Sequence, residues 1–191
     1  MMTTTGNEMI ATTRPTTTAT TRIDTPLGTL LASATQGALT GLWFIGQRHF
    51  PKHADGWVED HDVAPFDALR QQLHEYFDGK RRAFELPLSP NGSAATTFQR
   101  SIWNTIAAVP FGETITYAAL ASRCGRPTAM RAAGAATGRN PISIVIPCHR
   151  IIGSSGDLTG YAGGIERKVR LLQLESGRGA PATAQLDLGS H

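Results

Sequence analysis

The hydrophobic pattern of this chain changes at a short linker, and that change restricts the fold more than any other feature. Before the linker, apolar and polar residues alternate in short runs at 28–34 and 39–45, which is typical of strands. After the linker, apolar residues recur at helical spacing. The linker contains Pro87, Pro90, Asn91 and Gly92. We therefore predict an α+β chain with a small antiparallel-sheet domain over 22–92 and a mostly helical domain over 93–176.

The N-terminal domain is also predicted to contain one helix and a further strand. Apolar residues at helical spacing run from Phe66 to Phe77, and Asp78-Gly79 follows as a stop signal. Residues 83–88 predict the strand. The first 21 residues contain ten threonines and almost no large apolar side chain, so we expect a disordered tail. A transit peptide is the weaker alternative, and residues 177–191 form a second tail.

The C-terminal domain is predicted to contain a helix-turn-helix. Two short helices, at 117–123 and about 128–137, are joined by a tight turn. The second helix consists almost entirely of small residues, and Arg131 projects from it. Small residues permit close approach to a neighbouring part of the protein or to a DNA groove, and the sequence leaves both open.

Three further elements are expected in this domain. An apolar stripe predicts a helix over 98–109, and a short apolar run predicts a strand over 142–146. A last helix over 165–175 has apolar positions that alternate with basic ones. The apolar positions are Ile165, Val169 and Leu172, and the basic ones are Arg167, Lys168 and Arg170.

Charge is distributed unevenly along the chain. Residues 22–93 contain seven basic and nine acidic side chains, whereas residues 94–176 contain nine basic and four acidic ones. The second half therefore has a net charge of +5 and the first half −2. This asymmetry is typical of a domain that meets a polyanion, although an uneven solvated surface would have the same count.

The two cysteines, Cys124 and Cys148, are isolated, which favours a reducing compartment and gives no zinc-ligand spacing. Cys148 follows the predicted strand and precedes His149 and Arg150. A thiol reacts as its thiolate, and a nearby base or cation helps to form it. Because adjacent strand residues point to opposite faces, His149 can assist Cys148 only if the chain turns there or a water bridges them. A buried, unreactive cysteine is the alternative.

The surroundings of Cys148 contain a long ordered set of motifs. Asn140-Pro141, five further residues and Pro147-Cys148-His149-Arg150 form its centre. The other matching blocks are Phe98-Gln99-Arg100 with Trp103, residues 106–113, Thr116-Tyr117, residues 130–134, residues 160–164, Leu171-Leu172 and Glu175. Over about 94–176 the chain resembles the O6-alkylguanine–DNA alkyltransferase family, and residues 22–50 resemble the family's N-terminal domain. The resemblance implies an α/β roll of ribonuclease H-like type followed by a winged helix-turn-helix-like domain.

The resemblance also assigns catalytic residues. It implies that Cys148 takes the alkyl group and passes its proton through a water to His149. Glu175 would orient His149 and support it as it becomes cationic, which is the usual relation of nucleophile, base and orienting group. Asn140 would brace the turn that holds the cysteine, and Arg150 would support the structure.

Further residues are implied to contact DNA and the damaged base. Tyr117 matches the tyrosine that strains the 3′ phosphate and donates to guanine N3, and Arg131 matches the arginine that fills the space left by a flipped base. The other expected DNA-binding residues are Ala132, Ala133, Gly134 and Thr137. The expected substrate pocket consists of Pro147, Tyr161, Ala162 and Gly163.

The implied activity is direct reversal of DNA damage, that of a methylated-DNA–protein-cysteine S-methyltransferase. One irreversible transfer would remove an alkyl group from O6 of guanine, and from O4 of thymine, in double-stranded DNA. We expect no cofactor and no metal, since the N-terminal domain lacks the cysteines that bind zinc in some relatives. Ala162 and Ser143 depart from the serine and proline of some family members, which leaves the range of alkyl groups open.

Two other functions remain as alternatives. A damage sensor would bind alkylated DNA without repairing it, but such relatives replace the cysteine that this chain keeps. A cysteine hydrolase would need turnover of an acyl substrate, and no hydrolase motif is present. We expect a monomer in solution, with cooperative binding on DNA left open, no membrane association, and a location in the bacterial cytoplasm or nucleoid.

Overall fold

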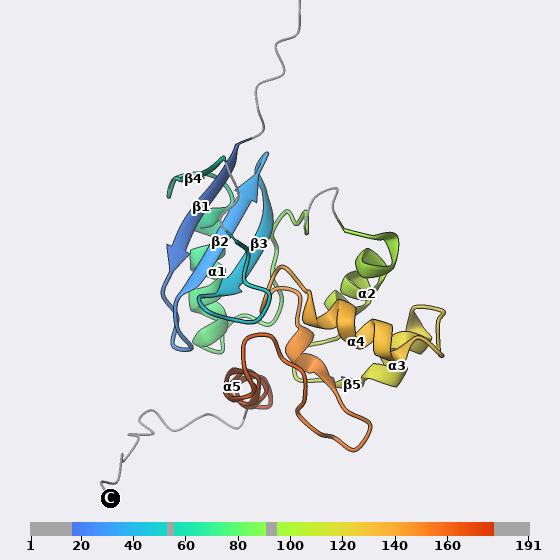
Figure 1. Ribbon diagram of the computed structural model, residues 1–191. Coiled ribbons are helices and arrows are strands. Elements are labelled where there is room, and N and C mark those ends of the chain that lie inside the picture. The colour runs from blue at the N-terminus through green and yellow to red at the C-terminus, as the bar shows by residue number, and fades with distance from the viewer. Residues whose placement is uncertain (1–16, 53–55, 91–94, 178–191) are drawn as a thin grey trace, which may run out of the picture.

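The structure is a computed structural model that describes residues 17–52, 56–90 and 95–177. A sheet domain with one helix lies beside a group of shorter helices (Figure 1). This arrangement confirms the predicted α+β class with a sheet domain and a helical domain. In the described part of the chain, no helix is long and apolar enough to cross a membrane.

The N-terminal sheet has the strand order β3-β2-β1-β4. Its strands are β1 (Thr18–Ile23), β2 (Leu30–Thr35), β3 (Ala38–Phe44) and β4 (Trp57–Glu59). Strand β2 pairs antiparallel with both β1 and β3, whereas β4 runs parallel to β1, so the predicted antiparallel sheet is in fact mixed.

Two predictions for this domain need correction. The expected tail over 1–21 is wrong for residues 18–21, which begin β1, because β-branched threonines suit a half-buried strand. Residues 1–16 lie outside the described residues, as does the tail from residue 178. The expected strand over 83–88 is also absent: only Leu88 bridges Leu39, since Pro87 has no N–H with which to continue a ladder.

Helix α1 (Phe66–Phe77) lies across one face of the sheet and has the predicted bounds (Figure 1). Its buried stripe contains Phe66, Leu69, Leu73 and Tyr76, which pack into the core beneath the strands. This placement directs the Tyr76 side chain toward the C-terminal domain, where its hydroxyl donates a hydrogen bond to Glu175.

The helix-turn-helix is present as α3 (Tyr117–Arg123) and α4 (Met130–Gly138). Helix α2 (Thr97–Ala107) begins with a capping box in which Thr96 and Gln99 satisfy each other's backbone N–H groups. The fully buried Trp103 of α2 donates from Nε1 to the Ala136 carbonyl of α4 at 2.9 Å. The small residues of α4 therefore serve in part to let α2 pack closely.

The predicted strand over 142–146 is wrong. The segment forms a turn in which Ile144 has a φ of 71°, and only Ile142 makes a β-bridge, to Leu42. Asn140 imposes this shape, because its Oδ1 accepts from Ile142 N at 3.1 Å and its Nδ2 donates to Ile146 O at 2.7 Å. A short 3₁₀ helix, η2 (Cys148–Arg150), and the two-residue strand β6 (Ile151–Ile152) follow, with β6 pairing parallel to β5 (Ile115–Thr116).

The last helix, α5 (Ile165–Glu175), has the predicted bounds but an unexpected buried face. Lys168, Leu171 and Glu175 are buried, whereas the apolar Ile165 is 43% exposed. The spacing of three and four residues places these buried side chains on one side of the helix. A basic residue and an acidic residue of α5 thus face the interior beside the 3₁₀ helix that contains Cys148.

Candidate active site

Cys148 lies in a tight turn, 6% exposed, at the first position of the 3₁₀ helix. The Asn140 amide donates from Nδ2 to Cys148 Sγ at 3.1 Å, in addition to bracing the turn. Burial raises the pKa of the Cys148 thiol, while the Asn140 hydrogen bond and the nearby Lys168 ammonium oppose that rise. The resting group is therefore a thiol that must lose its proton before or during attack.

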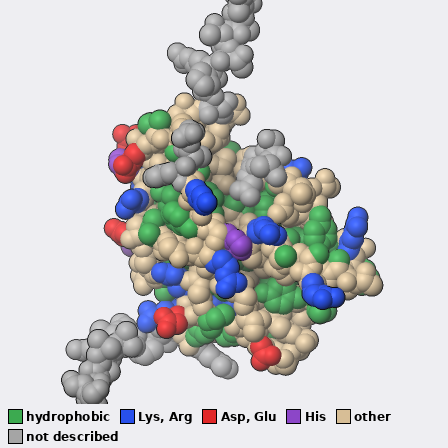
Figure 2. Space-filling view, viewed as in Figure 1, with side chains coloured by type: hydrophobic (Ala, Val, Ile, Leu, Met, Phe, Trp, Pro, Cys, Tyr) green, Lys and Arg blue, Asp and Glu red, His purple; other side chains and the backbone are tan. Residues whose placement is uncertain are grey.

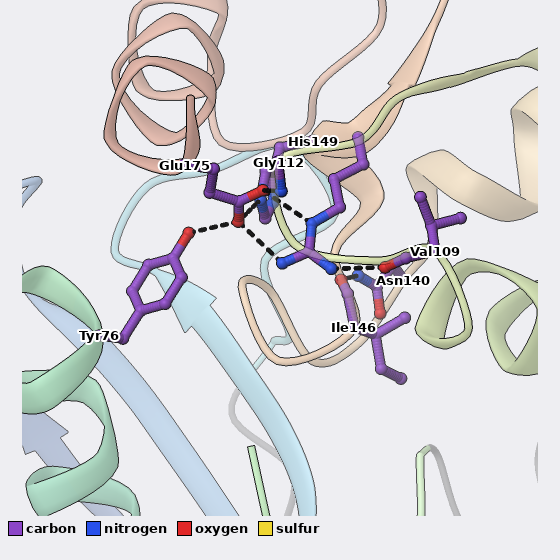
Figure 3. A network of polar contacts seen from close by, with 8 residues as sticks. Tyr76, Val109, Gly112, Asn140, Ile146, His149 and Glu175 are labelled. Carbon is purple, nitrogen blue, oxygen red and sulfur yellow. Dashed lines mark hydrogen bonds and ion pairs between the residues drawn. The ribbon is translucent and has the colours of Figure 1, made fainter. Parts of the chain in front are cut away.

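A buried polar network centred on Glu175 lies next to this turn (Figure 3). Its Oε1 accepts from Tyr76 Oη at 2.7 Å and from Arg150 Nη2 at 2.9 Å, and lies 2.8 Å from His149 Nε2. Its Oε2 accepts from Arg150 Nε at 2.8 Å and from Gly112 N at 3.3 Å. The two bonds from Arg150 form the bidentate pair that a guanidinium makes with a carboxylate.

These contacts keep the glutamate ionised. Burial alone would raise the pKa of the Glu175 carboxyl, but the hydrogen bonds from His149 and Arg150 outweigh it and lower the pKa from 4.5 to about 2. Arg150 also donates from Nη1 to the Val109 carbonyl at 2.6 Å, so this side chain is fixed at both ends. These contacts are consistent with the supporting role that the resemblance implies for Arg150.

The network also determines the protonation state and tautomer of His149, which is fully buried. Burial lowers its pKa and the charge of Glu175 opposes that effect, so the imidazole is neutral near pH 7. Because Nε2 faces an ionised carboxylate, Nε2 carries the hydrogen and Nδ1 is the acceptor. Nδ1 is buried and has no hydrogen-bond partner in the described part of the protein. The residue beside the thiol thus presents an unused basic nitrogen.

The expected DNA-binding residues fall into two groups on α4. Arg131 and Ala132 are exposed, and Gly134 is partly exposed with the ring of Tyr117 close by. Ala133 and Thr137 are buried, and the Thr137 hydroxyl donates to the Ala133 carbonyl at 2.8 Å. The prediction is wrong for the side chains of Ala133 and Thr137, because they are buried in the protein rather than exposed to solvent.

Tyr117 stands at the edge of a pocket of about 330 Å³. Its hydroxyl donates to the Thr159 carbonyl at 3.3 Å, and burial raises its pKa, so it remains a hydrogen-bond donor at neutral pH. Two expected pocket residues, Tyr161 and Ala162, line the same pocket. The described residues that line this pocket are Arg48, His49, Tyr117, Gly134, Ala135, Gly138, Arg139, Thr159, Gly160, Tyr161 and Ala162.

The other two expected pocket residues lie elsewhere. Pro147 lines a different hollow, between the domains, which also contains Phe84 and Phe111. Gly163 packs inside the protein, where an added Cβ would lie 2.7 Å from Tyr161 Cε1 and 3.0 Å from Phe44 Cδ2. Gly163 therefore makes room for the ring of Tyr161, which lines the pocket, and for the buried ring of Phe44.

Several residues of the site were missed from the sequence. Tyr76 was assigned only to the core stripe of α1, and nothing in the sequence links it to a glutamate 99 positions later. Lys168 was predicted only as one of the basic positions of the last helix, yet its Nζ donates to the carbonyls of Ile151 at 2.6 Å and Thr159 at 3.0 Å. Its spacing from Leu171 and Glu175 was the signal that it shares their buried face.

The site also depends on the N-terminal domain through Gln47. Its Oε1 accepts from the backbone N of Phe44 at 3.0 Å and from the hydroxyl of Ser143 at 3.3 Å. Leu42 N donates to Pro141 O, and Ser143 N donates to Leu42 O, both at 2.8 Å. The turn before Cys148 is therefore held between Asn140 on one side and strand β3 on the other. Where the structure describes the chain, no group of three or more His, Cys, Asp or Glu side chains could hold a metal ion.

Comparison with known proteins covers both domains. Residues 19–90 match the family described as 6-O-methylguanine DNA methyltransferase, ribonuclease-like domain, and residues 97–177 match 6-O-methylguanine DNA methyltransferase, DNA binding domain. The chain belongs to this methyltransferase family.

Relatives in the family align over most of both chains. A methylated-DNA–protein-cysteine methyltransferase of Methanosarcina barkeri is 44% identical over 154 residues, which are 80% of this chain and 94% of the relative. That of Mycolicibacterium paratuberculosis is 42% identical over 164 residues, 86% and 95% of the two chains. A crystal structure of Mycobacterium tuberculosis OGT in complex with DNA superposes with a TM-score of 0.77 and 40% identity, covering 84% of this chain and 94% of that one.

Proposed function

We propose that this protein is a methylated-DNA–protein-cysteine methyltransferase that repairs O6-alkylguanine in double-stranded DNA. The observation that carries the proposal is one cluster of contacts around the cysteine. Asn140 donates a hydrogen bond to the Cys148 sulfur, and Glu175 binds Nε2 of His149. Nδ1 of the same histidine is buried and has no hydrogen-bond partner among the described residues. A nucleophile, a base and an orienting carboxylate are the parts needed to activate a thiol. The family membership supports DNA as the partner.

The chemical step is a displacement at the alkyl carbon. A bond forms between Cys148 Sγ and that carbon as the bond from the carbon to O6 breaks, leaving a thioether and guanine. The thiol proton leaves through one water to His149 Nδ1, and Glu175 stabilises the imidazolium that results. Guanine leaves as an anion and takes up one proton from water, and the imidazolium returns the thiol proton to solvent, so the protons balance. Hydrogen bonding from Tyr117 to guanine N3 makes the base a better leaving group.

The base must leave the helix before it can meet the sulfur. An atom inside a stacked duplex is out of reach of a buried thiol, and flipping costs a few kcal/mol. Arg131 stands exposed on α4, where it would fill the vacated space, and Ala132 and Gly134 would allow close approach to the groove. Tyr117 and Tyr161 border the pocket that receives the base. We extend the substrate to O4-alkylthymine, which presents an alkoxy carbon in the same position.

Each molecule is expected to act once, because the thioether is stable and no second nucleophile adjoins Cys148 among the described residues. We expect one equivalent of O6-methylguanine to disappear from duplex DNA per equivalent of protein. The Cys148→Ser variant should remove none. The matched Cys124→Ser variant, which changes the other cysteine, should remove a full equivalent. Removal of several equivalents, or removal by Cys148→Ser, would refute the proposal.

A further inference from the structure

The loop that follows β3, residues 45–50, brings two exposed basic side chains to the mouth of the pocket in the C-terminal domain. Arg48 and His49 line this pocket beside Tyr117 and Gly134. We infer that this loop is a second DNA contact, in which the N-terminal domain binds a backbone phosphate of the strand that carries the lesion. The inference rests on the proposed function and adds a domain to its DNA-binding surface.

The loop is fixed to the pocket wall by atoms other than the basic groups. Arg48 N donates to the Ala162 carbonyl at 3.0 Å, which ties the loop to the segment that borders the pocket. The buried Gln47 side chain bonds to Ser143 in the turn before the nucleophile. Phe50 N donates to Gln47 O at 3.2 Å and closes a tight turn in which His49 has a φ of 59°. Backbone hydrogen bonds and the Gln47 side chain therefore hold the loop in place, and the side chains of Arg48 and His49 remain exposed to solvent.

The chemistry of the pocket mouth fits a phosphate. Arg48 and His49 face Arg139, the residue that caps the end of α4, and all three are exposed. His49 and Arg139 also line an adjoining hollow of about 230 Å³, so they stand on the ridge between two depressions. Among the residues that the structure describes, neither hollow is lined by an aspartate or glutamate. Figure 2 shows basic side chains and a histidine gathered over the middle of this face, with acidic ones toward its edges.

The path of a DNA strand explains why the contact would be to the backbone. A nucleotide whose base occupies the pocket leaves its flanking phosphates at the rim. One side of that rim is α4, with Gly134, Ala135 and Gly138, and the other side includes the loop with Arg48. A guanidinium presents several N–H donors in the geometry that matches phosphate oxygens. The contact would therefore hold the strand once the base has been flipped.

The test compares salt-dependent binding of duplex DNA that contains one O6-methylguanine by proteins that carry Cys148→Ser to block transfer, with Arg48 either unchanged (the wild type of this comparison) or replaced by alanine. Each phosphate contact contributes about −0.9 to the slope of log affinity against log salt. The ratio of the affinity at about 50 mM salt to the affinity at about 200 mM salt should therefore be about threefold to fourfold smaller for Arg48→Ala than for the wild type. Arg48→Lys keeps the charge and should keep the ratio of the wild type. Arg22→Ala, at an exposed position of β1, is the matched control and should also leave it unchanged.

Methyl transfer gives a second readout. Arg48→Ala should slow transfer from duplex DNA at least about threefold more than transfer from the free base O6-methylguanine, which has no phosphate. Equal losses with both substrates, or a salt ratio equal to that of Arg22→Ala, would overturn the inference. Wild-type protein that transfers no methyl group would refute the proposed function instead, and the binding comparison would still decide whether this loop contacts DNA.

Discussion

Replacing Glu175 with glutamine removes the charge that holds a buried arginine, histidine and tyrosine together. The drop in the pKa of this carboxyl from 4.5 to about 2 corresponds to about 3 kcal/mol of folding free energy, at about 1.4 kcal/mol for each pH unit. Removing one partner of a buried ion pair costs about 3–5 kcal/mol, since Arg150 would keep its charge without the carboxylate. Both routes predict that Glu175→Gln lowers the free energy of unfolding at pH 7 by about 3 kcal/mol.

The dependence on pH has a definite sign. A carboxyl whose pKa is lowered in the folded state stabilises the protein above its unfolded pKa of 4.5, and this stability is lost as the pH falls toward about 2. Urea unfolding of the wild type and Glu175→Gln at pH 7 and at about pH 3 measures this. The difference between the two proteins should shrink at the lower pH. Glu113→Gln, at an exposed glutamate of the same domain, is the control. A Glu175→Gln loss below about 1 kcal/mol at pH 7 would refute the reasoning.

Three other substitutions test separate parts of the site. Tyr76→Phe removes one donor to the buried carboxylate and should cost about 1–3 kcal/mol in urea unfolding; an unchanged midpoint would show that the bond contributes nothing. Asn140→Ala removes the hydrogen bond to the thiol, so the midpoint of the pH profile for thiol alkylation should move to higher pH, and a shift downward would contradict the assignment. Gly163→Ala should cost about 1–3 kcal/mol through overpacking, whereas Gly138→Ala, which points into open space, should cost nothing; equal effects would argue against the crowding.

The helices were the most predictable part of the fold. The ranges 66–77, 117–123 and 165–175 agree with the structure, because a glycine with positive φ follows each helix within two residues of its end, at Gly79, Gly125 and Gly177. The run over 142–146 was misread since five apolar residues fit a strand equally well, and the hydrogen bonds of Asn140 decide its shape. The threonines of β1 carried too little hydrophobic signal to be distinguished from a tail.

The chemistry of the site was only partly predictable. The motifs predicted that Cys148, His149 and Glu175 belong to one site, and the structure brings His149 against Glu175 in the turn that contains Cys148. The contacts of Tyr76 and Gln47 depend on how two domains pack, and no local pattern encodes a pair so far apart in the chain. The buried side of α5 could have been predicted, because Lys168 and Glu175 lie three and four residues from Leu171 and so share its side of the helix.

Covalent transfer to Cys148 is most directly tested by mass spectrometry of the protein after reaction with duplex DNA that contains one O6-methylguanine. We predict a gain of about 14 Da, one per molecule, confined to the peptide that contains Cys148. The peptide that contains Cys124 serves as the internal comparison. Protein that binds the damaged duplex yet gains no mass would contradict the proposed transfer and indicate a damage sensor.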